Sequence, residues 1–244
     1  MSLGRHRRDW EDLATLDPLW AVSGKRSATI EEFLGTGETE IDTVLRESHR
    51  LGLPARHERA LDFGCGLGRI TQALARRFEW CDAVDISEGM LQRARELSAE
   101  TPPNCSFHLN DRPALELFPA DHFDFAYSSF VLQHMPSRGV AAHYIRELMR
   151  VTRRDGLVVF QMPAHLPVWN RAQLRRRAYA PLRQLGVSGA VLQRLRLHPV
   201  RMIALSRSEI DHIVEDYGGS VAHSEPVDDS STISGFRYYV ALTG

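Results

Sequence analysis

A glycine-rich turn between an apolar run and a helical pattern constrains this chain more than any other feature. Gly64, Gly66 and Gly68 alternate directly after the apolar residues around Ala60-Leu61. The pattern from Arg69 to Phe78 that follows is typical of a helix. Glycine permits a sharp turn and lets the backbone lie against a ligand, because it has no Cβ. A strand, a glycine turn and a helix N-terminus together predict a cofactor cradle.

The glycine spacing distinguishes between two classes of cofactor. The dinucleotide fingerprint G-x-G-x-x-G/A needs a small residue where Arg69 stands. The spacing here is G-x-G-x-G, with Asp62 two residues ahead of the first glycine, and this resembles motif I of class I S-adenosylmethionine (SAM)-dependent methyltransferases. In that family the acidic residue faces the cationic methionine end of the cofactor. The resemblance implies that SAM is bound by Asp62, Gly64, Cys65, Gly66 and Gly68.

Further positions downstream of the turn indicate a nucleoside. The predicted strand from Trp80 to Ile86 contains Asp85, which accepts ribose hydroxyls in such folds. This feature fits NAD and SAM equally, and an acid at a helix N-terminus is the alternative interpretation. The family resemblance also implies that Ile86 and Met90 pack near the adenine. It further implies that Asn110 or Asp111, after a third strand, hydrogen-bonds the adenine amino group, and a role in a turn stays open for both.

Strand and helix patterns continue to alternate toward the C-terminus. A fourth strand, 123–129, leads into Phe130, and in the resembled family this region lines both cofactor and substrate, which implies cofactor contacts for Ser128 and Phe130. A helix over 140–151 precedes a fifth strand over 156–162. We therefore predict an α/β, doubly wound, mainly parallel seven-stranded sheet. In the family's arrangement, strands over 221–227 and 236–242 form a C-terminal antiparallel hairpin.

The domain organisation follows from where this alternation starts and stops. Residues 1–37 are predicted as an N-terminal helical segment or cap with a loop at 35–37, and 38–163 as the SAM-binding core, beginning with a helix over 38–52. Residues 206–244 are predicted to complete the core with a helix, capped by a Ser206/Glu209 capping box, and the last two strands.

Residues 164–205 form a predicted helical insert after strand five. The segment contains no Asp or Glu and has eight arginines. We expect two or three short helices, broken near Pro181 and around 186–189. Three interpretations stay open: a lid over the substrate, a solvated basic face, and a nucleic-acid surface.

Candidate residues for the chemistry are few. Methyl transfer is an in-line displacement in which the protein supplies alignment, and a base is needed only for a protonated acceptor. His134 is the candidate base because an imidazole titrates near neutrality. His165 is a second candidate near the substrate, and Trp20 and Trp169 are candidates for an apolar acceptor pocket.

Composition excludes several classes of function. Lys25 is the only lysine, so a dehydrogenase pair of the Tyr-x-x-x-Lys type cannot exist. The net charge is −1 and the three cysteines have no zinc-ligand spacing, which makes nucleic acid an improbable partner and a reduced, cytoplasmic, bacterial setting the expectation. No run of apolar residues has the length of a membrane span. We expect no metal site, because Ser128 and Met162 end strands four and five where metal-dependent relatives carry acids.

Together these observations predict a metal-independent methyltransferase that uses SAM on a small-molecule O, N or C acceptor. A nicotinamide-dependent oxidoreductase on a Rossmann fold is the first alternative, and a non-catalytic SAM-fold binding module is the second. The sequence leaves open the identity of the acceptor and the oligomeric state.

Overall fold

The computed structural model describes residues 3–23, 29–98, 104–167, 172–230 and 233–242. The strands are β1 (Arg59–Phe63), β2 (Trp80–Asp85), β3 (Cys105–Leu109), β4 (Phe123–Ser128), β5 (Thr152–Pro163), β6 (Gly219–Ser230) and β7 (Ile233–Leu242). The helices are α1 (Leu3–Leu16), α2 (Pro18–Ser23), α3 (Ile30–Leu51), α4 (Arg69–Ala75), α5 (Glu88–Leu97), the 3₁₀ turn η1 (Leu132–His134), α6 (Arg138–Val151), α8 (Leu174–Gln184), α9 (Gly189–Arg194) and α10 (Arg207–Glu215).

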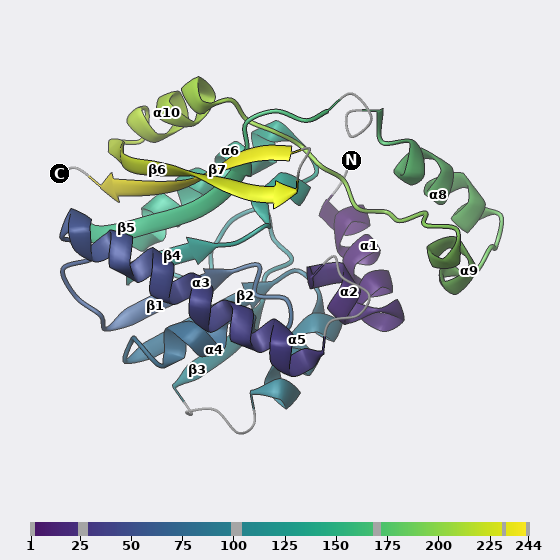
Figure 1. The fold of residues 1–244 in the computed structure, drawn as a ribbon, viewed down its shortest axis with the longest axis horizontal. Helices are drawn as coiled ribbons and strands as arrows, with labels where there is room; N and C mark the ends of the chain where they lie inside the picture. The colour runs from purple at the N-terminus through teal and green to yellow at the C-terminus, as the bar shows by residue number, and fades with distance from the viewer. Residues whose placement is uncertain (1–2, 24–28, 99–103, 168–171, 231–232, 243–244) are drawn as a thin grey trace.

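The strands form one seven-stranded sheet in the order β3-β2-β1-β4-β5-β7-β6 (Figure 1). Strands β1 to β5 pair in parallel, while β7 inserts antiparallel between β5 and β6. The predicted fold class is therefore confirmed, including the C-terminal antiparallel hairpin. The order reverses between β1 and β4, and ligands of such sheets bind outside the carboxyl ends of the strands at this point.

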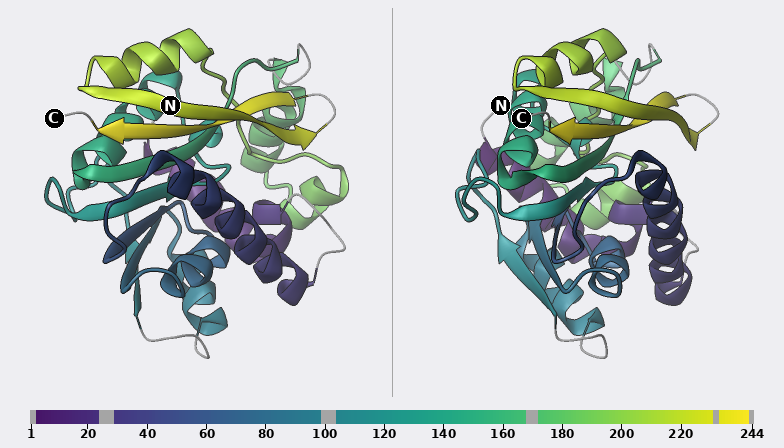
Figure 2. Two further views of the ribbon diagram at one scale, coloured as in Figure 1. Left: turned by 60° about the vertical axis from the view of Figure 1, so that its left-hand side comes forward. Right: turned by 90° about the vertical axis from the view of Figure 1, so that its left-hand side faces the viewer.

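Two buried clusters cover the two faces of the sheet. On one face Ile41 and Val44 of α3 pack with α4 against β1, β2 and β4. On the other face α6 and α10 contribute Ile145, Leu148 and Ile210 to a larger cluster. Figure 2 shows the dark-blue helix α3 crossing one face. The central strand β4 is buried along its whole length, as expected for a strand with helices on both sides.

Helix α3 is longer than we predicted. It begins at Ile30 and not at residue 38, after a Thr29/Glu32 capping box, so the predicted loop at 35–37 is wrong and the 37/38 boundary falls inside a helix. The glycine at 37 serves close packing and not a loop, because a Cβ there would lie 2.3 Å from the carbonyl oxygen of Arg69. The glycine brings α3 against the start of α4.

The insert contains the short helices α8 and α9, as predicted, but Pro181 lies inside α8 and does not break it. The turn at 186–189 separates the two helices as expected. Figure 1 shows α8 and α9 beside α1 and α2. No helix among the described residues has the length and apolar character that crossing a bilayer requires.

Candidate functional site

One cavity lies at the carboxyl ends of β1, β2 and β4, at the reversal of strand order. The turn after β1 forms its floor, the end of β2 and Asn110 form one side, and the segment after β4 forms the other. It is lined by Leu3, His6, Trp10, Ala21, Val22, Phe33, Asp62, Phe63, Gly64, Cys65, Gly66, Arg69, Ile70, Val84, Asp85, Ile86, Met90, Asn110, Ser129, Phe130, Val131, His134, Met135 and Tyr144.

The glycine turn is fixed by hydrogen bonds within the protein. The backbone N–H groups of Gly64 and Cys65 both donate to the carbonyl of Val84, at 2.8 and 3.0 Å. The N–H of Gly66 donates to Asp85 Oδ2 at 2.9 Å. Glycine-rich loops bind a pyrophosphate through free backbone N–H groups. The N–H groups of Gly64, Cys65 and Gly66 already have acceptors within the protein, so this turn is poorly suited to a pyrophosphate. The geometry favours a ligand that is cationic at this end.

Asp85 ties the turn to the start of α5. Its Oδ2 accepts the N–H of Gly66, and its Oδ1 accepts the N–H of Ser87 at 2.9 Å. Burial raises the pKa of the Asp85 carboxyl, although these backbone N–H groups oppose the shift. Each carboxylate oxygen has capacity for one more hydrogen bond, so the group can still accept from two neighbouring hydroxyls.

Asp62 lies under the turn and is 2% exposed. The hydroxyl of Thr71 donates to its Oδ2 at 2.7 Å. Burial raises the pKa of Asp62 to about 7, with the Thr71 hydrogen bond acting in the opposite direction. A buried carboxyl that titrates near neutrality responds strongly to a cation placed beside it.

Most of the predicted cofactor residues meet at this cavity. Its lining includes Asp62, Gly64, Cys65, Gly66, Asp85, Ile86, Met90, Asn110 and Phe130, together with the candidate base His134. Of the two competing residues after β3, the lining contains Asn110, whereas Asp111 pairs with Arg7 at 2.7 Å.

Several predicted residues lie elsewhere. Gly68 caps α4 and packs toward Ala94 and Phe107. Ser128 is buried and donates to the carbonyl of Phe63, so its neighbour Ser129 lines the cavity instead. Among the substrate candidates, the Trp20 ring lies 5.9 Å from that of His198, His165 is exposed near Ser234, and Trp169 falls outside the described residues.

The N-terminal helices cover the cavity. Sequence reasoning predicted this segment as a helical segment or cap, but it did not identify Leu3, His6 or Val22 as lining residues. Leu3, His6 and Trp10 lie at helical spacing on α1 and line it together. Val22 of α2 sits on the turn, since a Cβ on Gly66 would lie 2.8 Å from its Cγ1. By contrast, no described residue of 164–205 lines the cavity. The insert contacts α1 from outside, where Gly189 approaches Leu16.

Glu11 fastens α1 to the start of α5. Its carboxylate accepts from Ser87 Oγ at 3.0 Å and from the N–H groups of Glu88 and Gly89 at 2.8 and 3.2 Å. These N–H groups belong to the first turn of α5, which has no intrahelical partner for them. The contact holds α1, which lies over the cavity, against the start of α5 beside Asp85.

We expect Glu11→Ala to loosen α1 selectively. Losing a helix-terminal acceptor costs about 1 kcal/mol, so amide exchange over 3–16 should accelerate while exchange in β4 stays unchanged. Asp12→Asn is the control, since Asp12 meets Arg183 only at 3.5 Å near the surface. Equal exchange in both variants would show that Glu11 does not hold the cover.

His134 is oriented by two neighbours. Its Nδ1 lies 2.6 Å from the carbonyl oxygen of Arg201, which only accepts, so Nδ1 carries the proton. Its Nε2 lies 3.3 Å from Gln133 Nε2, an amide donor, and so serves as an acceptor. The ring also packs edge-on against Trp10. A catalytic role for this imidazole stays a prediction.

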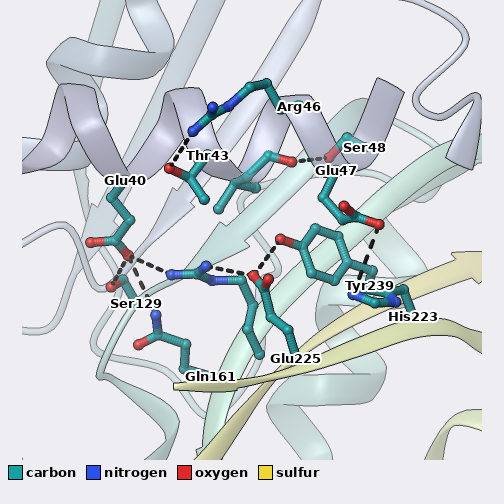
Figure 3. Close-up of polar contacts among 12 residues, drawn as sticks. Glu40, Thr43, Arg46, Glu47, Ser48, Ser129, Gln161, His223, Glu225 and Tyr239 are labelled. Carbon is teal, nitrogen blue, oxygen red and sulfur yellow. Dashed lines mark hydrogen bonds and ion pairs between the residues drawn. The ribbon is translucent and has the colours of Figure 1, made fainter. Parts of the chain in front are cut away.

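A buried polar cluster lies beside the cavity and centres on Glu40 (Figure 3). Glu40 Oε2 accepts from Arg69 at 2.6 Å, and its Oε1 accepts from Tyr127 at 2.6 Å and Ser129 at 2.7 Å. Arg237 lies 3.8 Å from Oε1 and continues to Glu225 at 2.7 Å. Although burial acts against the charge, Arg69 and the two hydroxyls lower the pKa of Glu40. The cluster joins α3, α4, β4, β6 and β7.

Comparison with known proteins agrees with this geometry. Residues 60–156 match a family described as a methyltransferase domain. Malonyl-[acyl-carrier protein] O-methyltransferase of Erwinia pyrifoliae is 38% identical over 107 residues, which are 44% of this chain and 38% of that protein. Trans-aconitate 2-methyltransferase of Pseudomonas aeruginosa is 28% identical over 202 residues, which are 75% of this chain and 68% of that protein. The chain spans well under half the length of the first curated relatives it matches.

Solved structures share the fold over the whole chain. Magnesium protoporphyrin IX methyltransferase of Synechocystis, with bound SAM, superposes with a TM-score of 0.64 at 17% identity, covering 99% of this chain and 98% of that one. A SAM-dependent methyltransferase of Leishmania major gives a TM-score of 0.65 at 14% identity, covering 98% of this chain and 82% of that one.

Proposed function

We propose that this chain, a class I SAM-dependent methyltransferase by fold and by domain family, transfers a methyl group to a small-molecule acceptor held under its N-terminal helices. The observation that carries the proposal is the cavity at the reversal of strand order. It joins the glycine turn, Asp85 and Asn110 to an apolar compartment beneath α1. Residues suited to a nucleoside and residues suited to an apolar acceptor thus line the same cavity.

The residues present fit SAM. Gly64 and Gly66 have φ values of 78° and 52°, and a Cβ on Gly66 would intrude beside Val22. The Asp62 carboxylate, next to a turn whose N–H groups already have acceptors, fits the ammonium of SAM. The Asp85 carboxylate fits the two ribose hydroxyls, and the Asn110 amide fits the edge of the adenine. When bound, SAM supplies a methyl group on a sulfonium, and the protein contributes orientation and exclusion of water.

Two observations support a small-molecule acceptor. The cover that α1 and α2 place over the cavity favours a small molecule or a small group over a nucleic-acid base in a duplex. Matching relatives are named for malonyl groups on carrier protein, trans-aconitate and phosphoethanolamine. We propose a metal-independent transfer in the cytoplasm of a bacterium, with His134 as the base for a protonated acceptor.

Calorimetry with S-adenosylhomocysteine and with NADH tests the cofactor assignment. We expect S-adenosylhomocysteine to bind and NADH not to bind. The reverse result would support the oxidoreductase alternative. Binding of S-adenosylhomocysteine without methyl transfer to any small-molecule fraction would support the non-catalytic alternative.

Asp85→Ala should weaken cofactor binding. The variant loses a charged acceptor for ribose hydroxyls and one anchor of the turn, which we expect to cost about 1–3 kcal/mol of binding free energy. Calorimetry with S-adenosylhomocysteine measures it, and an unchanged melting temperature would confirm the fold. Full affinity in a folded variant would move the ribose contact elsewhere.

The pKa of Asp62 predicts a pH-dependent affinity. A cationic ligand binds the ionised carboxylate preferentially, and burial raises the pKa of Asp62 to about 7. SAM affinity should therefore rise by up to about tenfold per pH unit below this value and level off above it. Binding should also release a proton near pH 6. Asp62→Asn should remove both effects, and a variant that keeps the slope would assign it to another group.

A further inference from the structure

The insert over residues 164–205 concentrates positive charge in a chain whose net charge is only −1. It holds eight arginines and neither Asp nor Glu, so the rest of the chain carries an excess of acids. No described residue of the insert lines the cofactor cavity. The proposed methyl transfer therefore gives this charge no role, and the surface that carries it requires a separate explanation.

The most exposed large apolar side chains among the described residues also lie in this insert. Leu185 is 80% exposed, Leu174 67% and Leu195 62%, and Val191 adds a fourth at 45%. A single exposed leucine is ordinary on a protein surface, but four such residues on two short helices indicate an interaction surface. Helices α8 and α9 contact each other, and Figure 1 shows both at the edge of the molecule, away from the sheet.

On α8 the exposed residues form one stripe. Leu174 and Leu185 are eleven residues apart, which is close to three helical turns, so they lie on the same side of the helix. Arg177 and Pro181 fall between them on this side and are exposed as well. The opposite side carries Tyr179, which is 5% exposed, and this side packs on the protein.

Helix α9 repeats the arrangement. Val191 and Leu195 are one helical turn apart, and the N–H of Leu195 donates to the carbonyl of Val191 at 3.1 Å. Leu192 is fully buried and anchors the other side of the helix. Arg194 and Arg196 stand on either side of Leu195 and are exposed. Both helices thus present aliphatic side chains flanked by arginines.

The arginines of this surface have little counter-charge within the protein. Of the exposed arginines in α8 and α9, only Arg183 pairs with a carboxylate of the described residues, Asp12 of α1 at 3.5 Å. Arg175, Arg177 and Arg194 have no carboxylate partner in that part of the chain. Such a surface attracts an anionic partner, while the exposed leucines gain free energy only where the partner is also apolar.

We propose that the exposed face of α8 and α9 binds the surface of an anionic lipid bilayer. The arginines would meet the lipid phosphates, and the leucines would enter the boundary between head groups and acyl chains. Long arginine side chains allow both contacts at once, because a guanidinium can stay at the head groups while a leucine beside it lies deeper. The contact is peripheral, since no helix in the described ranges is long and apolar enough to span a bilayer.

Three other occupants fit the surface less well. Nucleic acid is held by cations together with stacking aromatic rings, but the exposed apolar side chains here are aliphatic and Tyr179 is buried. Protein interfaces place apolar residues at the centre and charges at the rim, whereas here arginines stand between the leucines. A second copy of this chain, docked by twofold symmetry, would bring arginines against arginines.

The surface adjoins the cover of the cavity. Gly189, the first residue of α9, approaches Leu16 of α1, and Arg183 reaches Asp12 of the same helix. A bilayer bound to α8 and α9 would therefore lie near the helix that covers the cavity. Lipid binding goes beyond the proposed methyl transfer and does not depend on it, because the surface shares no described residue with the cavity lining.

Cosedimentation of the full chain with lipid vesicles tests the proposal. We expect binding to vesicles of equal parts phosphatidylcholine and phosphatidylglycerol, and binding about tenfold weaker to phosphatidylcholine alone. Added salt should weaken binding to the anionic vesicles, because it screens the arginines. The assay needs neither cofactor nor acceptor, so its result is independent of whether the chain transfers methyl groups.

The leucines are tested by combining Leu174→Gln with Leu185→Gln. Both side chains already face solvent, so this variant should fold like wild type and keep its melting temperature. We expect its binding to anionic vesicles to fall about 100-fold, because two apolar side chains no longer enter the bilayer. Leu117→Gln is the control and should bind like wild type, since Leu117 is 51% exposed but lies outside the insert.

The arginines are tested by combining Arg175→Gln with Arg177→Gln. We expect binding to fall about 30-fold at low salt, and the difference from wild type to shrink at high salt. Arg46→Gln combined with Arg50→Gln is the control. It removes the same charge from exposed positions on α3 and should leave vesicle binding unchanged.

Each other outcome overturns the proposal. A wild-type chain that ignores anionic vesicles would leave an acidic protein as the occupant. Binding that depends on the arginines but not on the leucines would describe a surface for anions such as nucleic acid. Self-association that is lost in the leucine variant, without vesicle binding, would identify a second copy of the chain. Unchanged vesicle binding in both variants would place the lipid contact outside α8 and α9.

Discussion

Gly64→Ala is expected to abolish useful cofactor binding in a protein that still folds. Gly64 has a φ of 78°, and an added Cβ would lie 2.4 and 2.5 Å from the two Cγ atoms of Val131. The left-handed backbone costs an alanine about 1–2 kcal/mol, and overpacking adds about 1–3 kcal/mol. The turn must shift to relieve the contact, so we expect an affinity loss of about 100-fold for S-adenosylhomocysteine.

Gly35→Ala provides the matched control for this variant. Gly35 lies inside α3, and an added Cβ there would meet nothing within 4 Å. Alanine is the better helix former, so stability should rise by about 0.5–1 kcal/mol while cofactor affinity stays unchanged. Calorimetry and thermal melts measure both variants. Wild-type affinity in Gly64→Ala would mean that the turn after β1 is not the cofactor cradle.

The central fold could be predicted because its signals are local. Strands β1, β2 and β4 are short apolar runs between turn residues, and the cap residues Ser87 and Ser206 stand directly before their helices. The candidate cofactor residues follow from the same alternation, since Asp62 and Asp85 fall at strand ends. Parallel connection then brings these strand ends together without further information.

The predictions that were wrong or incomplete concern features that depend on long-range packing. The glycines at 35 and 37 resemble a loop in sequence, but Gly37 is small because α4 approaches it. Asn110 and Asp111 are neighbours that both carry an oxygen able to accept from an adenine amino group, and only the position of Arg7 on α1 draws Asp111 outward. Residues 1–37 were predicted as a helical segment or cap without its lining residues. The helical spacing of Leu3, His6 and Trp10 was the signal for its inner face, but no local feature shows which surface that face meets.

The Glu40 cluster is the part of the site that no sequence window could have shown. Its members come from α3, α4, β4, β6 and β7, and Arg69 and Glu40 are 29 positions apart. In the sequence Arg69 was informative only as a misfit to the dinucleotide pattern. In the fold the Arg69 guanidinium is held in one orientation, because its Nη1 donates to Glu40 and its Nη2 donates to Ser129.

Glu40→Ala is therefore expected to destabilise the protein more than other single changes of a charged residue in α3. Removing one partner of a buried ion pair costs about 3–5 kcal/mol, because Arg69 and the hydroxyls of Tyr127 and Ser129 lose their acceptor. For a chain of this size the melting temperature should fall by about 10 °C. Glu38→Ala is the control, since Glu38 lies one half-turn earlier and pairs with Arg76 and Arg77 near the surface.

The pH dependence of this difference identifies its electrostatic part. The pKa of Glu40 is lower in the folded protein than its ordinary 4.5. A depressed carboxyl pKa stabilises the fold above the unfolded value, and this contribution is lost as the pH falls through the folded value. The gap in unfolding free energy between wild type and Glu40→Ala should thus be constant near neutrality and narrow below about pH 4.5. A gap that stays constant under acid conditions, or a melting temperature equal to that of Glu38→Ala, would mean that the cluster contributes packing and not charge pairing to the wall that holds Arg69.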